Sequence, residues 1–227
     1  MSSIKGRPRW LAWSVGWLLL CALAVVFALV SPSGRSATAD PGPATAADTG
    51  FARDMAVHHQ QAVEMSFLVR ENTGNEEVRT LAYDVINTQA NQRGMMLGWL
   101  DMWQSPKISA DGAMAWMEGH GKGMAATEMP GMATRDQLDR LKNAKGRDAE
   151  VLYLQLMIPH HQGGVVMAEA AVKQVKNPQV KALAEGIVRA QQSEINLMTG
   201  MLAQRGATTA PASPQPTPSA STPAAHH

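Results

Sequence analysis

Apolar residues recur at spacings of three and four along two stretches of this chain. In one stretch the stripe is Val180, Leu183, Ala184, Ile187, Gln191, Glu194, Met198 and Met201, and in the other it is Val78, Leu81, Ala82, Val85, Gln89, Gln92, Met96 and Trp99. This spacing follows the 3.6 residues of a helical turn and predicts a long helix over each stretch. No alternation typical of strands occurs between residues 48 and 204, so the pattern predicts an all-α fold.

Both stretches belong to a longer internal repeat with a constant offset of 102 positions, which relates residues 51–100 to residues 153–202 without a gap. Each copy reads as a helix bearing two adjacent histidines, then a break at 72–75 or 176–178, then a second helix. Two copies therefore predict two helical hairpins and four helices. A further helix is expected in the connection, opened by a capping box at Thr134 and closed by Gly146.

Composition divides the rest of the chain. Residues 10–30 carry no charge and follow Lys5, Arg7 and Arg9, and a helix of this length spans about 31 Å. We interpret residues 1–30 as a membrane anchor or a signal segment, with cleavage after Ala39 left open, and the part beyond as extracytoplasmic. Residues 31–47 and 205–227, rich in Pro, Ala, Ser and Thr, are expected to be disordered. The folded domain is expected at residues 48–204.

Net charge and cysteine content exclude several partners. The formal charge is +1 over 227 residues, so nothing in the overall balance indicates a nucleic acid. The one cysteine, Cys21, lies in the N-terminal apolar run. The folded domain therefore has neither a disulfide nor a thiolate ligand.

The repeated histidines indicate a duplicated metal site. On a helical projection Met55, His58, His59, Ala62 and Met65 share an arc of about 120°, and the second copy places Met157, His160, His161, Gly164 and Met167 on the same arc. The small residue at the centre of each arc leaves space for an ion or for a partner helix. Pro159 is expected to kink or start its helix.

Imidazole and thioether ligands together suit copper, because thioethers favour the cuprous ion and imidazoles accept either oxidation state. Gln191 and Glu194 interrupt an apolar stripe, and a cation or a neighbouring histidine would stabilise a buried carboxylate. The connection adds Met114, Met117, His120, Met124, Met129 and Met132. The predicted metal ligands are His58, His59, His160, His161, Met55, Met65, Met157, Met167, Gln191, Glu194, Met198 and His120.

Other interpretations of the same residues are open. The methionines fit a flexible core, and Gln191 and Glu194 could hydrogen-bond the histidines without an ion. The chain contains neither the Glu-x-x-His of di-iron carboxylate proteins nor the His-Glu-x-x-His of zinc hydrolases, so no enzymatic activity is predicted. The alternative to a copper-binding protein is a metal-free, membrane-tethered helical module that binds a protein partner of unknown identity.

Several motifs together resemble the family called domain of unknown function 305, over about residues 48–204. They are Met157 to Gly164, Met167-Ala168, Asn177 to Val180, Gln191 to Met198, and Met129-Pro130-Gly131-Met132 before a short helix. The resemblance implies a ferritin-like four-helix bundle in bacterial proteins that are exported or membrane-attached, with copper bound by some members. The first repeat departs from the family pattern at Val57, Gln61 and Arg93.

Overall fold

The computed structural model describes residues 44–117, 119 and 122–209, and this part of the chain is helical. Its four long helices are α2 (Ala46–Asn72), α3 (Glu76–Met102), α5 (Gly146–Gln174) and α6 (Pro178–Gln204). The connection between α3 and α5 holds the short 3₁₀ helix η1 (Ala126–Glu128) and helix α4 (Arg135–Asn143). Extended pairing within the described residues is limited to an isolated bridge between Ala113 and Met124. The all-α prediction is therefore confirmed.

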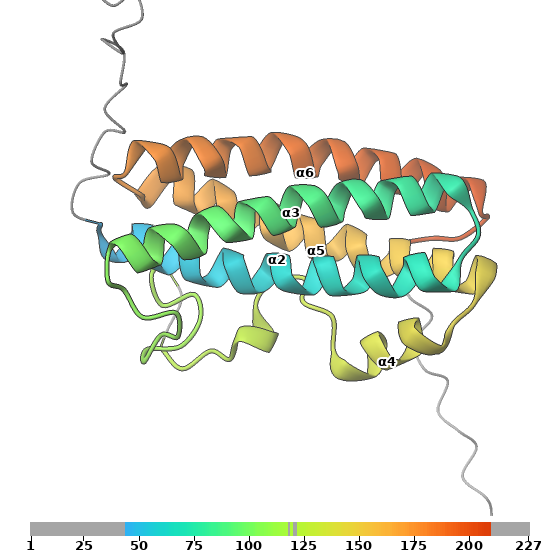
Figure 1. Ribbon diagram of the computed structural model, residues 1–227, viewed down its shortest axis with the longest axis horizontal. Helices are drawn as coiled ribbons and strands as arrows, with labels where there is room; N and C mark the ends of the chain where they lie inside the picture. Colours follow the sequence, from blue (N-terminus) through green and yellow to red (C-terminus); the bar gives the residue numbers. More distant parts are fainter. Residues whose placement is uncertain (1–43, 118, 120–121, 210–227) are drawn as a thin grey trace, which may run out of the picture. The chain divides into compact units, whose positions relative to one another are not determined.

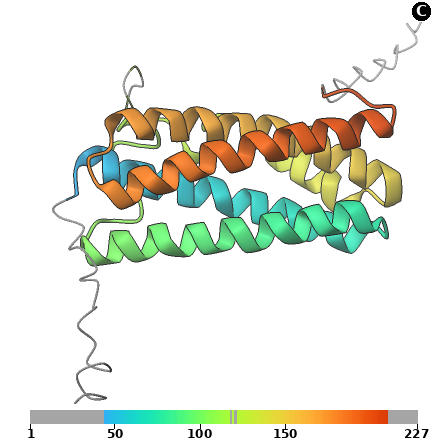
Figure 2. The ribbon, with the colours of Figure 1, turned by 90° about the horizontal axis from the view of Figure 1, so that it is seen from above.

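The long helices form the two hairpins that the repeat predicts. Helix α2 packs along α3, helix α5 packs along α6, and α2 also packs along α5. Figures 1 and 2 show α3 and α6 on one side of the α2–α5 pair, and the α3–α5 connection with α4 on its other side. The two helices that carry the paired histidines are thus covered from both sides.

Asparagine side chains start the second helix of each hairpin at equivalent positions. Asn75 accepts a hydrogen bond from the backbone of Val78, and Asn177 accepts hydrogen bonds from the backbones of Gln179 and Val180. A side-chain oxygen at this position satisfies amide groups that have no partner within the helix. The turns predicted at 72–75 and 176–178 are confirmed.

Helix α4 begins as predicted but ends earlier. The Thr134 hydroxyl accepts from the Gln137 amide and the Gln137 side chain accepts from the Thr134 amide, which completes the predicted capping box. The expectation that Gly146 closes this helix is wrong. Ala144 is already extended, with ψ 151°, and Gly146 is the first residue of α5 with a positive φ of 54°. Glycine at that position allows the chain to turn directly from one helix into the next.

In each repeat, an acidic residue near the start of the first helix accepts hydrogen bonds from the turn between the two helices of the other repeat. Buried Asp48 accepts hydrogen bonds from the backbone amides of Lys176 and Asn177, at 3.0 and 2.9 Å. Its counterpart Glu150 accepts from the Thr73 hydroxyl at 2.6 Å and from Arg205 at 2.8 Å. These hydrogen bonds to charged groups connect the two hairpins at both ends.

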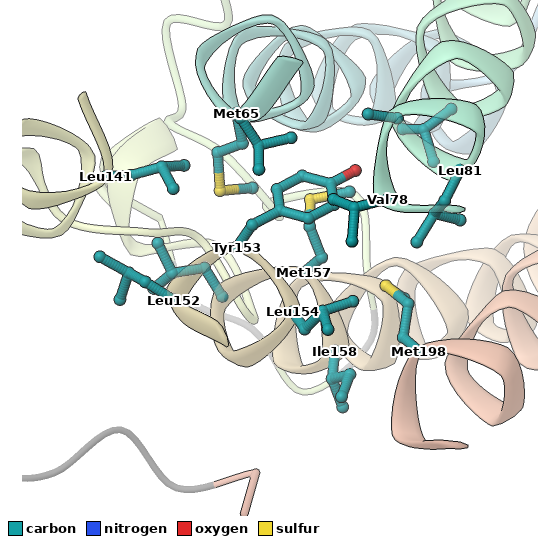
Figure 3. Close-up of a cluster of buried hydrophobic side chains, with 14 of the residues drawn as sticks. Met65, Val78, Leu81, Leu141, Leu152, Tyr153, Leu154, Met157, Ile158 and Met198 are labelled. Atoms are coloured by element: carbon teal, nitrogen blue, oxygen red, sulfur yellow. The ribbon is translucent and has the colours of Figure 1, made fainter. Parts of the chain in front are cut away.

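The apolar core consists of two clusters in which methionine is prominent. One contains Tyr153 together with Met65, Met157, Met198 and Met201, and Figure 3 shows part of it. The other contains Phe51 together with Met55, Met96, Met114, Met129 and Met167. Each cluster therefore draws methionines from both repeats.

The predicted membrane segment lies outside the described residues. Within the described part of the chain, no helix is both long and apolar enough to cross a membrane. The predicted disordered tail lies largely outside it too, because the description ends at residue 209.

Candidate metal site

The four repeated histidines lie in the interior, as their helical arc predicts. His58 and His59 on α2 and His160 and His161 on α5 each have 0% of their surface exposed. The rings of His58 and His160 stack across the interface of the two repeats, with centroids 3.8 Å apart and planes inclined by 34°. The ring centroids of His160 and His161 are 6.3 Å apart. The fold thus joins the two His-His pairs into one buried cluster.

Hydrogen bonds at Nε2 define the tautomers of three of these histidines. His58 Nε2 donates to the Pro130 carbonyl at 3.0 Å, and His161 Nε2 donates to the Glu194 carboxylate at 2.8 Å. His59 Nε2 donates to the Gln92 carbonyl oxygen at 2.7 Å. Because these acceptors carry no proton, the proton of each contact resides on Nε2, and Nδ1 of a neutral ring keeps its lone pair.

Those lone pairs have no partner among the described residues. The Nδ1 atoms of His58, His59 and His161 and both ring nitrogens of His160 are buried without a hydrogen bond. An unpaired polar atom in the interior costs about 1–3 kcal/mol. A cluster of such atoms is therefore unfavourable for stability.

Two glutamines extend the set of unpaired donors and acceptors. The amide groups of Gln89 on α3 and Gln191 on α6, at equivalent positions of the repeats, are buried and have no hydrogen-bond partner among the described residues. Gln191 lies directly over Gly164, because a Cβ atom at Gly164 would be 2.3 Å from its Oε1. The small residue at the centre of the arc thus accommodates a neighbouring side chain from α6.

Burial keeps His58, His59 and His160 neutral. Desolvation lowers the pKa of His58 to about 4 and that of His59 to about 3, and neighbouring imidazoles lower both further. Desolvation and the three neighbouring histidines hold the pKa of His160 well below its ordinary value of 6.5. At neutral pH these rings are unprotonated, which is the form that binds a metal ion.

The predicted methionine ligands flank the histidines on both sides along the helices. The His59–Gln92 contact fixes the register of α2 against α3, so Met55 and Met96, one turn away on each helix, lie at the same level of the hairpin. The His161–Glu194 contact does the same for Met157 and Met198. All four side chains have 0% of their surface exposed. Met167 belongs to the cluster of Met55, and Met65 to the cluster of Met157.

The described part of the chain contains no additional acidic or histidine side chains that would form a complete metal site with the four histidines. Across residues 44–117, 119 and 122–209, no group of three or more His, Cys, Asp or Glu side chains is arranged to hold a metal ion. His120 lies outside the described residues. Met114 and Met129 of the connection are buried in the core next to α2 and α5.

The connection covers the histidine cluster through Pro130 to Ala133. Besides the His58–Pro130 hydrogen bond, the Gln61 amide exchanges two hydrogen bonds with the backbone of Ala133, at 2.9 and 2.7 Å. On α5 the same segment lies against Gly163, where a Cβ atom would be 1.9 Å from the Pro130 carbonyl oxygen. At Gly131, which has φ 78°, a Cβ atom would be 2.2 Å from the Pro159 carbonyl oxygen. The segment is therefore held by both histidine helices.

This contact accounts for one of the positions at which the two repeats differ. Gln61 and Gly163 are equivalent in the repeat, and one holds the segment by hydrogen bonds while the other gives it space. Val57, the counterpart of Pro159, is 38% exposed. Pro159 lies inside α5 and does not start it, so that alternative is wrong. Met157 stays buried in spite of the proline.

Several residues of the cluster were absent from the predicted ligands, namely Gln61, Gln89, Gln92 and Pro130. Gln89 and Gln92 could have been included, because they match Gln191 and Glu194 at the repeat offset. The contacts of Pro130 with His58 and of Ala133 with Gln61 could not be predicted, because no periodicity relates the connection to the helices it covers.

Replacing Gly163 by Ala is expected to destabilise the protein by about 1–3 kcal/mol, because its new methyl group overlaps the Pro130 carbonyl. Gly186, inside α6, is the matched control, since nothing lies within 4 Å of a Cβ atom there. Gly186→Ala should stabilise by about 0.5–1 kcal/mol through helix propensity. Urea denaturation of both variants measures the difference, and equal effects would contradict the close packing of the connection on α5.

The structure thus defines an all-helical protein made of two repeated hairpins that enclose a histidine cluster. The family described as "Domain of unknown function (DUF305)" matches residues 48–202, and the chain belongs to this family. The resemblance inferred from the motifs is confirmed.

Solved structures with the same fold agree with this assignment. A candidate secreted DUF305 protein from Streptomyces coelicolor is 56% identical, with a TM-score of 0.67, and the match covers 71% of this chain and 94% of that one. A DUF305 fragment from Deinococcus radiodurans is 31% identical, with a TM-score of 0.60 and coverage of 71% and 99%. CopM in its Cu(II)-bound form is 27% identical, with a TM-score of 0.55 and coverage of 69% and 96%.

A curated relative matches a smaller part of the chain. The uncharacterized protein L153 of Acanthamoeba polyphaga mimivirus is 43% identical over 53 residues, which is 23% of this chain. The matched stretch spans about a third of the viral protein, 35% of its length.

Proposed function

We propose that this chain is an extracytoplasmic copper-binding protein that sequesters or delivers the ion through the buried histidines of its two repeats. The observation that carries this proposal is the set of unpaired Nδ1 atoms on imidazoles whose Nε2 atoms donate to fixed acceptors. Metal-bound histidines usually donate their second ring N–H to a carboxylate or a backbone carbonyl. His161 with Glu194 and His58 with Pro130 have this arrangement.

Copper is the ion that this donor set favours. Neutral imidazole and thioether side chains bind copper in both oxidation states, whereas magnesium and calcium require oxygen ligands. Gln191, with its counterpart Gln89, offers an amide oxygen beside the rings, and Glu194 acts through His161. CopM, which has this fold, is described in a Cu(II)-bound form.

We also propose the cellular location and domain limits that the sequence suggests. Residues 1–30 would anchor the chain or direct its export, residues 31–47 would link it to the domain at 48–204, and residues 205–227 would form a tail. The similar Streptomyces protein, described as a candidate secreted protein, supports this location. The two hairpins joined along α2 and α5 support a ferritin-like bundle.

Copper titration of the purified protein tests the proposed function. Wild-type protein should bind cupric ion, with d–d absorption and nitrogen hyperfine coupling in the electron paramagnetic resonance spectrum. Replacing His58, His59, His160 and His161 together by Ala should weaken this binding more than about 100-fold, since it removes the ligands themselves. Circular dichroism verifies that the variant is folded. Undiminished affinity in a folded variant would place the site in Met114 to Met132, and absence of binding by wild-type protein would favour the metal-free interaction module.

Replacing Met55, Met65, Met157 and Met167 by Leu is expected to weaken cuprous affinity about tenfold or more and to change cupric affinity little. A thioether is a soft donor, so its loss affects the monovalent ion most. Leu conserves volume and should cost less than about 1.5 kcal/mol per site. Met95 and Met102, which are 49% and 62% exposed, provide the control pair for the same substitution. Competition with a cuprous chelator measures the affinities, and an equal loss for both ions would contradict this role.

A further inference from the structure

The two halves of the histidine cluster differ in one chemical respect. In the first repeat His59 Nε2 donates to the amide of Gln92, and in the second His161 Nε2 donates to the carboxylate of Glu194. The two hydrogen bonds have nearly the same length, 2.7 and 2.8 Å, and occupy equivalent positions of the repeat. Gln89 and Gln191, which lie one turn before these acceptors, are the same residue type in both halves.

An amide and a carboxylate orient the imidazole ring equally well, but they differ in their effect on its strength as a ligand. Either acceptor holds the ring as the Nε2–H tautomer and directs the Nδ1 lone pair away from it. Only the carboxylate also places a negative charge behind the ring, which makes the imidazole a stronger donor. Charges interact more strongly in a buried site than in water, so this difference is large for a bound ion.

Glu194 lies close enough to the buried cluster for its negative charge to act on it. His161 is fully buried, and the Glu194 side chain is 22% exposed, so the carboxylate lies at the edge of the cluster. Among the described residues its hydrogen-bond partner is His161, at 2.8 Å. The negative charge of Glu194 also acts on buried Tyr153. Together with burial, it raises the pKa of the Tyr153 hydroxyl.

We propose that Glu194 is a positioning residue that makes the His161 half of the cluster selective for cupric ion, while the His59 half, held by Gln92, lacks this preference. This inference rests on the proposed function. A fixed negative charge stabilises a divalent ion more than a monovalent one, so Glu194 should raise the ratio of cupric to cuprous affinity. Glu194 itself acts through His161 and does not contact the ion.

Three variants test this role: Glu194→Gln, Gln92→Glu and the double exchange of both. Glu194→Gln should lower cupric affinity about 10- to 100-fold, the usual effect of removing a residue that supports a ligand, and should change cuprous affinity less. Gln92→Glu should increase the cupric preference, and the double exchange should restore it because a carboxylate then supports His59. Exposed Glu64 on α2 supplies the control Glu64→Gln, which removes one charge away from the cluster.

Two readouts separate this inference from the proposed function. Wild-type protein that binds no copper would refute the proposed function itself. Wild-type protein that binds copper, with an unchanged ratio of cupric to cuprous affinity in Glu194→Gln, would overturn the role of Glu194 alone. Equal loss for both ions that the double exchange does not restore would show a purely structural role and would also overturn it. The reduction potential of the bound copper should rise in Glu194→Gln, and nitrogen hyperfine coupling should persist.

Discussion

Lowering the pH from 7 to 4 is expected to reduce the free energy of unfolding of the metal-free protein by several kcal/mol. Burial lowers the pKa values of His58 and His59 to about 4 and about 3, whereas in the unfolded chain they return to about 6.5. Between pH 6.5 and 4 the unfolded state therefore binds more protons than the folded state, so stability falls with decreasing pH. Each pH unit across this window removes about 1.4 kcal/mol for each histidine that stays neutral.

Two carboxyl groups also have shifted pKa values. Burial raises the pKa of Asp54, so protonation of this group opposes acid unfolding. Burial alone would raise the pKa of Asp48 too, but its hydrogen bonds outweigh burial and lower it, so its contribution is lost only below its ordinary value of 3.8. Between pH 6.5 and 4 the histidines therefore lower the stability, and protonation of Asp54 offsets part of their effect near the acid end of this window.

Urea denaturation of metal-free protein at several pH values measures this effect. A His58→Leu and His59→Leu double variant should show a flatter profile over the same range, because two of the titrating groups are removed. A wild-type profile that is flat between pH 6.5 and 4 would contradict the burial of neutral histidines.

Replacing His160 by Leu is expected to stabilise the metal-free protein by about 1–3 kcal/mol and to weaken cupric binding more than about tenfold. Both ring nitrogens of His160 are buried without a hydrogen bond among the described residues, so an apolar side chain of similar size removes an unfavourable burial. The stacking contact with His58 is lost in exchange. Opposite changes in stability and affinity are typical of a residue retained for binding.

The matched variant is His161→Leu, which breaks the 2.8 Å hydrogen bond to Glu194 and should therefore bring no stabilisation. Thermal unfolding of metal-free protein and copper titration are measured on the same samples. If His160→Leu were destabilised as strongly as His161→Leu, the cluster would be a structural polar network.

Helical periodicity and the repeat were sufficient to predict the elements and the buried face. The positions of Asn75 and Asn177 predicted both turns, since capping depends on a few adjacent residues. The arc that holds His58 and His59 predicted their burial, because side chains three and four residues apart share one face of a helix. These features are local, so a single sequence contains the information that specifies them.

Local patterns could not predict where the connection crosses the helices. Gly146 resembles a helix end in sequence, yet the chain turns at Ala144 and uses the glycine to begin α5. Gln61, at the position equivalent to Gly163, departs from the family pattern, and nothing in the sequence explains this difference. The structure shows that Gln61 holds Pro130 to Ala133 against the histidine helices.

The sequence by itself determined the helical class, the duplication and the family of this protein, because periodicity, repeat register and motif are properties of neighbouring residues. Tertiary structure alone decided that His58 and His160 stack across the two repeats and that Pro130 covers them. It also decided that the Nδ1 atoms of these histidines have no partner within the described part of the chain, and that Gln92 and Glu194 are the unequal acceptors at Nε2 of His59 and His161. Contacts between residues 72 or 102 positions apart depend on how the helices pack, and helix packing is set by the shapes of all the side chains between them.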